Sequence, residues 1–529
     1  MSETIQVTVI TENERREQQE IKVTHDADMT LMTTLLKKEL ISGNFCGGRG
    51  TCKRCRVRFL QAPPLPTSLE RQAFAPDELR LGYRLACMAR PRNDCVIQLE
   101  LVQSREIEIL TDTSDMMDVS EKNDHLSQKE RTEKRYLIAV DLGTTTIAMQ
   151  LMDIDSEQVV DTYCAMNPQR SYGADVLSRI QAANAGAAAV LRESVWKVLR
   201  EGVSRFRRFC HAAEQTASLC CMCIAGNTTM AHLLMGLSTE GLGKSPFTPV
   251  ELGLQKCMLT LSADADVPLT ETMEEHMMVT GQVNSSRLPV YIAPGFSAFV
   301  GGDIAAGLYT LKMQGAALFI DLGTNGEMAV ADGKRMIVTA TAAGPAFEGG
   351  LGKAVVGSDM VAVTAFLLKE GIIDETGLMV EPYFEEGVTV SLSDAMNASG
   401  SSDSVYLTQK DIRDLQMAKA AVRAGVEVLW QKIGCPEISQ VYLAGGFGYY
   451  LNVDAAAAIG LLPEKWKPCT KAVGNTSLAG AFRMGKDLWT GKVREEALDE
   501  MLQGIESINL AEQKEFEALY IRYMDLRLS

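Results

Sequence analysis

The sequence predicts an α/β protein in which a small α+β unit at the N-terminus precedes a larger, two-lobed α/β body. Two observations support this prediction. Five cysteines lie among short strand patterns in the first hundred residues, and the body contains a strand–Asp-Leu-Gly-Thr–strand pattern twice, at Asp141 and at Asp321. Repetition of one supersecondary unit within a chain indicates two related lobes.

The first unit is expected to span residues 1–102. IQVTVI and IKVTHDADMT have the pattern of paired strands, and LMTTLLKKEL has the spacing of a helix. A loop rich in Gly and Cys follows, and then come CRVRFL and CVIQLEL, which have the pattern of further strands. Paired strands, one helix and further strands predict a small α+β domain.

Residues 103–134 are polar, charged and largely aperiodic, so we expect a flexible linker. The alternative is a surface strand and helix packed on the body. The body then spans 135–529, with lobes of roughly 135–315 and 316–529. Strand patterns alternate there with helical stretches such as TQKDIRDLQMAKAAVRAGVEVLWQKIG, which predicts an α/β arrangement.

Composition limits the class of protein. Of the 529 residues, 46% are apolar and 23% are charged, which is the balance of a globular protein. The formal net charge of −16 argues against general nucleic-acid binding. We find neither a secretory signal pattern nor an apolar run long enough to span a membrane, so we expect a cytoplasmic protein. Thirteen clustered cysteines then indicate metal or redox chemistry rather than a disulfide framework.

The cysteine cluster has the spacing C-x5-C-x2-C-x31-C, formed by Cys46, Cys52, Cys55 and Cys87. Thiolates on one glycine-rich loop and one distant strand suit a [2Fe–2S] cluster. The alternative is zinc, but zinc sites favour two C-x2-4-C pairs and only one is present. Cys95 competes with Cys87 for the fourth position. It opens an apolar strand, where a buried structural thiol is ordinary, so we choose Cys87.

Positive charge surrounds these cysteines. Between Phe45 and Glu100 there are ten basic and five acidic residues, in a chain that is acidic as a whole. This segment is either a docking face for an acidic partner or an ordinary solvated surface, and charge alone leaves both open.

The body carries three candidate nucleotide-binding segments: DLGTTT, DLGTNGE and AGGFG. In the first two, an Asp ends a strand, a Gly turn lets a phosphate approach, and Thr or Asn supplies donors. The Asp can orient Mg²⁺ through its waters. Each segment alone could be an ordinary hairpin turn, but three in this order resemble the superfamily of actin, sugar kinases and chaperone ATPases. That resemblance implies an actin-like, ribonuclease H-like body, with phosphate contacts at Asp141–Thr146 and Asp321–Glu327 and adenosine contacts at Gly445 and Gly446.

With the cysteine pattern ahead of this body, the chain resembles the reductive activators of corrinoid-dependent enzymes that have an N-terminal [2Fe–2S] domain. The segments that carry the resemblance include NPQRSYGADVLSRI, AGNTTMAHLLMG, PGFSAFVGGDIAAGL, AGPAFEGG and GNTSLAGA. The resemblance implies a ferredoxin-like (β-grasp) first domain. It further implies ATP-dependent transfer of one electron to inactive Co(II) of a corrinoid protein, which regenerates Co(I) for methyl transfer.

The resemblance also assigns residues and partners. The cluster ligands are Cys46, Cys52, Cys55 and Cys87. Asp141 and Asp321 are the catalytic aspartates. The ATP and Mg²⁺ contacts are Gly143, Thr144, Thr145, Gly323, Thr324, Asn325, Gly445 and Gly446. Asn227 and Glu348 are weaker candidates that could instead cap helices or satisfy turns. A corrinoid protein and a low-potential electron donor are the expected partners, and the oligomeric state stays open, with a homodimer as one option.

Two other functions remain open from the sequence. One is a small-molecule kinase of the sugar or acyl type with a regulatory iron–sulfur domain, which would transfer phosphate to a metabolite. The other is an electron-carrier adaptor without catalysis of its own, in which ATP only regulates docking. Replacing Asp321 separates the adaptor from the reductase, because only the reductase needs the nucleotide site for cobalt reduction.

Overall fold

The computed structural model describes residues 4–12, 18–38, 40, 55–74, 76–99, 134–173, 175–212, 217–260, 287–311, 313–323, 325–343, 357–396 and 404–526. The chain divides into two compact units. One consists of Met1–Glu108 with Met166–Val195, and the other of Ile109–Ala165 with Trp196–Ser529. The predicted linker lies outside the described residues apart from Lys134, so its boundaries stay a prediction.

The N-terminal residues form a five-stranded sheet in the order β2-β1-β5-β3-β4. Its strands are β1 Thr4–Glu12, β2 Gln18–Asp26, β3 Arg56–Gln61, β4 Tyr83–Leu85 and β5 Cys95–Leu99. Strands β1 and β5 are parallel, and the other neighbours are antiparallel. The helices are α1 Leu31–Lys37, α2 Ser68–Ala73 and α3 Pro76–Arg80. Val7, Val9, Leu31, Leu35 and Ile97 are buried in one core, as the alternating strand pattern predicts.

The first copy of the repeated pattern lies in a six-stranded sheet of the order β10-β11-β9-β6-β7-β8. Its strands are β6 Lys134–Leu142, β7 Thr146–Asp153, β8 Val159–Met166, β9 Ala217–Gly226, β10 Gln255–Thr260 and β11 Arg287–Ile292. Strand β9 runs parallel to both β6 and β11. It is followed by α7 Thr228–Met235 and the short η3 Gly241–Gly243. Cys220, Cys221 and Cys223 are buried in β9, as a core strand requires.

The stretch between β8 and β9 is divided into several helices. It consists of η1 Pro168–Ser171, α5 Val176–Ala182, the π-helical η2 Ala183–Ala187 and α6 Ala188–Ala212. Amphipathic spacing predicts helix over this stretch, but Gly186 has φ of +103°, which an α-helix does not allow. The break therefore falls at a glycine, where a left-handed backbone costs least.

The second copy lies in a six-stranded sheet of the order β18-β17-β12-β13-β14-β19. Its strands are β12 Ala316–Leu322, β13 Asn325–Asp332, β14 Met336–Ala342, β17 Gln440–Ala444, β18 Thr470–Ala472 and β19 Glu506–Ser507. In both copies the Asp-Leu-Gly-Thr segment joins two antiparallel strands, and the first strand of the pair has a parallel neighbour on its other side. The predicted duplication is therefore present in the topology.

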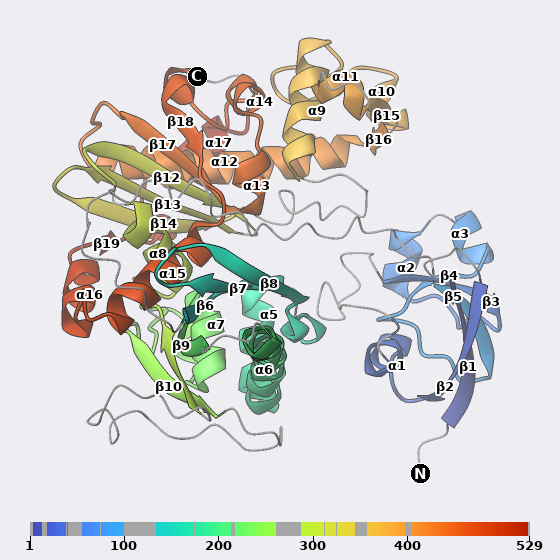
Figure 1. Ribbon diagram of the computed structural model, residues 1–529. Helices are drawn as coiled ribbons and strands as arrows, with labels where there is room; N and C mark the ends of the chain where they lie inside the picture. The colour runs from blue at the N-terminus through green and yellow to red at the C-terminus, as the bar shows by residue number, and fades with distance from the viewer. Residues whose placement is uncertain are drawn as a thin grey trace. The chain divides into compact units, whose positions relative to one another are not determined.

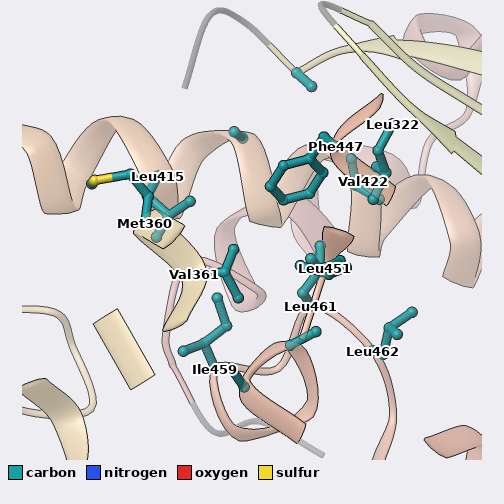
Figure 2. Close-up of a cluster of buried hydrophobic side chains, with 14 of the residues drawn as sticks. Leu322, Met360, Val361, Leu415, Val422, Phe447, Leu451, Ile459, Leu461 and Leu462 are labelled. Carbon is teal, nitrogen blue, oxygen red and sulfur yellow. The ribbon is translucent and has the colours of Figure 1, made fainter. Parts of the chain in front are cut away.

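Further elements surround the second sheet. Apart from α16 Glu495–Gln503, whose Leu498 and Leu502 pack in the core of the first sheet, they are α9 Gly357–Lys369, α10 Tyr383–Glu386, the pair β15 Val388–Ser391 and β16 Ser404–Leu407, α11 Leu392–Met396, α12 Gln409–Lys432, α13 Gly445–Tyr450, α14 Val453–Ala458, η5 Glu464–Cys469, η6 Leu510–Glu512 and α17 Phe516–Arg522. Figure 2 shows part of their core, in which the Phe447 ring of α13 lies near Leu322 of β12 and Val422 of α12. AGGFG therefore continues from strand β17 into a helix that its own phenylalanine anchors.

Two helices, α8 Gly302–Leu311 and α15 Thr476–Trp489, lie between the two six-stranded sheets (Figure 1). Their side chains enter the cores of both sheets. The helices cross closely, because a Cβ built on Gly480 would lie 2.0 Å from the carbonyl oxygen of Ala306. Helix α15 comes from the part of the chain that we expected in the second lobe, yet its Leu478 and Phe482 share a core with Leu137 of the first sheet.

Candidate functional site

Two of the four predicted cluster ligands lie side by side at one end of the N-terminal sheet. Cys55 directly precedes β3, and Cys87 follows β4, the antiparallel partner of β3. Their sulfur atoms are 3.2 Å apart, and neither thiol is in a disulfide. Two sulfurs bound at about 2.3 Å to one tetrahedral metal are about 3.8 Å apart, so this pair fits a shared iron. Cys46 and Cys52 lie outside the described residues.

Cys95 lies elsewhere in the sheet. It begins β5 opposite Val7 and is buried, and burial together with Asp94 raises its pKa to about 11. A thiol held in this protonated form is a poor metal ligand. The geometry therefore supports the choice of Cys87 over Cys95.

Strand β4 is fixed next to Cys87 by a buried carboxylate. Glu70 accepts hydrogen bonds from the backbone N–H groups of Thr67 and of Leu85, at 2.7 and 2.8 Å. Arg84, also buried, donates to the carbonyl oxygens of Pro64, Leu79 and Tyr83. Neither residue was singled out from the sequence, although TSLE has the pattern of a capping box, which the structure contains.

Much of the basic charge in this region is paired within the unit. Arg56 forms an ion pair with Glu78 at 2.9 Å, and Arg80 pairs with Asp77. Arg90 donates to the carbonyl oxygen of Asp28. Together with the buried Arg84, these contacts favour internal structural roles for several of the ten basic residues over a single docking face.

The first nucleotide-binding segment forms the turn between β6 and β7. A Cβ at Gly143 would lie 2.8 Å from the carbonyl oxygen of Thr146, so the turn has room only for glycine. Asp141, at the end of β6, accepts hydrogen bonds from the side chains of Asn475 (2.8 Å) and Ser477 (2.9 Å). Thr144 accepts a hydrogen bond from the side chain of Asn227 at 3.0 Å. Thr145 lies in the same turn.

The second and third segments meet at the end of β12. Asp321 pairs in register with Ala444 of β17, which places Gly445 against it. Gly445 has φ of +80°, and a Cβ there would lie 2.4 Å from Oδ1 of Asp321. By contrast, a Cβ at Gly446 would meet no atom within 4 Å. The fold therefore brings AGGFG and DLGTNGE together, as the superfamily resemblance implies.

Of the remaining predicted residues of the second turn, Gly323 and Asn325 are described by the structure and Thr324 is not. The N–H of Gly323 donates to the carbonyl oxygen of Asn325 at 2.9 Å, which closes the turn. Thr324, between them, lies outside the described residues, as does Glu348.

Four carboxylates gather around these turns: Asp141, Asp303, Asp321 and Glu327. Burial, followed by the nearby Asp303 and Asp141, raises the pKa of Asp321 to about 8. Burial and Asp141 raise the pKa of Asp303 to about 6. The pKa of Glu327 is raised by burial and then by Asp303 and Asp321. Burial also raises the pKa of Asp141, against the lowering effect of its bonds from Asn475 and Ser477.

This concentration of like charge suits a divalent cation. Within the described residues, no three His, Cys, Asp or Glu side chains are placed to hold a metal ion by themselves. Mg²⁺ usually keeps several waters and takes one or two carboxylates plus phosphate oxygens. The residues present therefore fit Mg²⁺ that arrives with a nucleotide.

Sequence reasoning gave no individual role to four residues of this site: Asp303, Asn475, Ser477, and Glu327, which it included only as the end of the predicted phosphate segment Asp321–Glu327. Three of them lie in PGFSAFVGGDIAAGL and GNTSLAGA, which supported the family resemblance without any chemical role for these side chains. Glu327 had a local signal, because a tight hairpin after Asp321 places it directly opposite that residue in β13. Asp303 and Asn475 had none, because only the tertiary fold brings them near the turns.

The two-lobed body with nucleotide turns at equivalent strand ends, together with the cysteine pair in the N-terminal sheet, defines an iron–sulfur protein with an actin-like ATPase body. Comparisons with family models agree. Residues 14–92 match the 2Fe-2S iron-sulfur cluster binding domain, residues 136–316 the RACo middle region, and residues 315–354 and 350–528 the C-terminal domain of RACo, the ASKHA domain. The chain belongs to the RACo family, the reductive activators of corrinoid-dependent enzymes.

Individual relatives share this character. Over 412 residues the chain is 29% identical to the corrinoid activation enzyme RamQ of Eubacterium limosum. The matched region covers 68% of this chain and 65% of that protein. It is 23% identical over 431 residues to the [Co(II) methylated amine-specific corrinoid protein] reductase of Methanosarcina barkeri, which covers 73% of this chain and 76% of that protein.

A solved structure shares the fold. The reductive activator for corrinoid, iron-sulfur protein superposes with a TM-score of 0.57 at 24% identity, over 98% of both chains. The predicted fold class, a ferredoxin-type α+β domain followed by an actin-like body, is thereby confirmed. The matched domains also indicate the cofactors: a 2Fe–2S cluster for the first domain, and ATP with Mg²⁺ for the body. No helix among the described residues is long and apolar enough to cross a membrane.

Proposed function

We propose that this protein uses ATP to drive reduction of a corrinoid protein, passing one electron to inactive Co(II) and so regenerating Co(I). The observation that carries the proposal is the presence in one chain of two separate sites. One is the Cys55–Cys87 sulfur pair in a 2Fe–2S domain, and the other is the acidic site where Asp141 and Asp321 meet. Relatives named for corrinoid activation and for Co(II) corrinoid protein reduction add support.

The energetics explain why both sites are needed. Plant-type 2Fe–2S clusters have reduction potentials near about −400 mV. Co(I) corrinoids are stronger reductants, so electron transfer to Co(II) runs uphill, and each ~59 mV of deficit costs a factor of ten. A nucleotide-dependent change that favours the reduced corrinoid by the same factor offsets this deficit.

The chain's own residues would divide this work. Cys46, Cys52, Cys55 and Cys87 would hold the cluster, which supplies electrons one at a time. Gly143, Thr144, Thr145, Gly323, Thr324 and Asn325 would surround the phosphates, and Gly445 and Gly446 the adenosine. Asp141 and Asp321 would orient Mg²⁺, and the like-charge repulsion among the four carboxylates would be relieved by that cation.

The same proposal names the setting. A corrinoid protein of a methyltransferase system would be the substrate, and a low-potential electron donor would reload the cluster. Unpaired thiols, such as the exposed Cys164 and Cys435, suit the reducing cytoplasm. A homodimer would place two clusters in one assembly, and light scattering would measure the oligomeric state.

The direct test mixes the reconstituted protein with a low-potential reductant, Mg-ATP and a corrinoid protein in the Co(II) state. We expect the visible absorption of Co(II) to give way to that of Co(I) only when ATP is present. Absence of this conversion, with the iron content confirmed, would refute the proposal. Phosphate transfer to a metabolite would instead identify a kinase.

A further inference from the structure

Two helices of the body begin at the first nucleotide-binding turn, and each begins with an asparagine that makes two contacts. Oδ1 of Asn475 accepts the N–H of Leu478 at 2.8 Å, which caps α15, while its Nδ2 donates to Asp141 at 2.8 Å. Oδ1 of Asn227 accepts the N–H of Met230 at 2.9 Å, which caps α7, while its Nδ2 donates to Oγ1 of Thr144 at 3.0 Å.

Only asparagine suits both tasks at these positions. Ser, Thr and Asp also cap helices well, but Ser and Thr are shorter and an aspartate carries no N–H group. Asn452 shows the ordinary case in the same body: its Oδ1 accepts the N–H of Ala455 at 2.9 Å and so caps α14, outside this site. Capping alone therefore does not account for the amide contacts to the turn.

Ser477 completes the arrangement. Its hydroxyl donates to Oδ1 of Asp141 at 2.9 Å, while Asn475 donates to Oδ2. Both donors are buried, with 8% and 6% of their surfaces exposed. Asp141 is thus held by both oxygens, from residues more than 300 positions later in the chain, in one fixed orientation.

The start of α15 also contacts α8, a second helix that contributes a carboxylate to the acidic site. Oγ1 of Thr476 would lie 2.8 Å from a Cβ on Gly307, so α15 begins in close contact with α8. Helix α8 carries Asp303 in its first turn. The start of α15 therefore fixes Asp141 directly and fixes the helix that bears Asp303.

We propose that Asn475 and Ser477, with Asn227 in a supporting place, are positioning residues that hold the Asp141–Thr145 turn in the geometry that binds Mg-ATP. The inference rests on the proposed ATP-dependent function and adds residues to its site. None of the three touches the nucleotide in this scheme. They act through Asp141 and Thr144.

The test compares substitutions that keep the cap and remove the amide donor. Asn475→Asp keeps the acceptor for Leu478 but sets a carboxylate against Asp141. Ser477→Ala removes the other donor, and Ser477→Thr restores a hydroxyl. Asn452→Asp makes the same exchange at a cap outside the site. Each variant is made in the full-length, cluster-loaded protein.

We measure the thermal midpoint, Mg-ATP binding by titration calorimetry, and kcat and KM for ATP hydrolysis. A hydrogen bond to a charged group is worth about 10- to 100-fold in an equilibrium, so Asn475→Asp is expected to weaken Mg-ATP binding by at least tenfold. Ser477→Ala weakens it by a similar factor and Ser477→Thr recovers it. Asn452→Asp leaves binding, kcat and the midpoint unchanged.

Asn227→Asp gives a second signature. The hydroxyl of Thr144 can turn to donate to the new carboxylate, which diverts it from a phosphate oxygen. We expect a higher KM for ATP with little change in kcat. If Asn227 had a merely structural role, Asn227→Asp would lower the thermal midpoint without raising the KM for ATP at a nearly constant kcat.

Two results would overturn the proposal. One is that Asn475→Asp and Ser477→Ala bind Mg-ATP as tightly as Asn452→Asp does. The other is that they bind Mg-ATP more weakly only to the extent that their thermal midpoints fall. If Asn475→Asp does not fold, the Ser477→Ala and Ser477→Thr pair decides alone. Wild-type protein that binds Mg-ATP but reduces no corrinoid would refute the proposed function while leaving this inference standing.

Discussion

Cys55 and Cys87 show how single side chains define a site. Their sulfurs face each other because β3 and β4 pair in antiparallel register, with Arg56 opposite Leu85. Cys95 shares the sheet but is buried in β5, with a pKa raised to about 11. Position in the sheet therefore separates the proposed ligand pair from a buried thiol that has the same chemistry.

This separation predicts the outcome of two alanine substitutions. Cys87→Ala is expected to abolish the visible absorbance of the 2Fe–2S cluster after anaerobic reconstitution, because one iron loses a thiolate. Cys95→Ala is expected to retain it. Absorbance and iron content per chain measure both. If Cys95→Ala loses its iron while Cys87→Ala keeps its cluster, the fourth ligand would be Cys95.

Lys419 is a second informative residue and belongs to neither proposed site. Its side chain is fully buried, and Nζ donates to the carbonyl oxygens of Tyr523 and Asp525 at 2.7 and 2.6 Å. It thereby ties the C-terminal segment after α17 to α12. Burial, followed by the neighbouring Arg423, lowers its pKa from 10.5 to about 7.

The lowered pKa of Lys419 predicts a pH dependence of stability. Between about pH 7 and 10.5 the unfolded chain binds a proton here that the folded chain does not, so this residue's contribution to stability rises with pH. The slope is at most about 1.4 kcal/mol per pH unit. The difference in free energy of unfolding between wild type and Lys419→Met, measured by urea denaturation, should grow from pH 7 to pH 10.

The matched control for Lys419 is on the same helix. Lys410 is exposed and pairs with Asp414, so Lys410→Met should give a difference that is flat with pH over this range. A Lys419→Met difference that is equally flat, or that shrinks as pH rises, would contradict the burial argument.

At the scale of elements, the contact between α8 and α15 organises the body. Side chains from both helices enter the cores of the two six-stranded sheets. The contact depends on small residues, because the crossing places Gly480 against the backbone of Ala306 and Gly307 against Thr476. Helices can approach this closely only where no side chain intervenes.

The crossing predicts that Gly480→Ala is strongly unfavourable. Its new methyl group would lie 2.0 Å from a backbone oxygen, and overpacking of this kind typically costs about 1–3 kcal/mol. Gly448→Ala is the control, since its Cβ would meet its nearest neighbour at an ordinary 3.4 Å. Thermal unfolding should show a lowered midpoint for Gly480→Ala and an unchanged or raised one for Gly448→Ala. Equal midpoints would show that the helices adjust freely.

At the scale of the whole molecule, the chain combines two kinds of site in units that each have their own core. The cysteine pair lies at the core of the five-stranded sheet, whereas the four carboxylates lie in the body, on β6, β12, β13 and α8. Because the cores are separate, a substitution that empties one site should leave the other functional.

This independence gives a reciprocal prediction for the proposed reaction. Asp321→Ala should keep the cluster absorbance but reduce ATP hydrolysis and cobalt reduction by at least about 10²-fold, as loss of a charged group that orients Mg²⁺ implies. Cys87→Ala should keep Mg-ATP binding and lose cobalt reduction. Both are measured on the same preparations by calorimetry and visible spectroscopy. Cobalt reduction that survives Asp321→Ala would favour a docking role for ATP.

Local patterns were sufficient to predict a large part of this protein. Strand alternation, the DLGT turns and the cysteine spacing predicted strands, the duplication and the class of cofactors, because each is a pattern that can be read along the sequence without knowing how the chain folds. The helical stretch that breaks at Gly186 shows the limit, since the spacing alone does not tell at which residue a helix is interrupted.

The tertiary structure alone decided which distant residues meet. Asn475 and Ser477 reach Asp141 across 334 and 336 positions, and Asp303 joins the acidic site from α8. Nothing local distinguishes a capping asparagine that also holds an aspartate from one that only caps, as Asn452 does. The residues of each turn determine its chemistry. The partners that orient the turn depend instead on how helices far apart in the chain pack between the sheets.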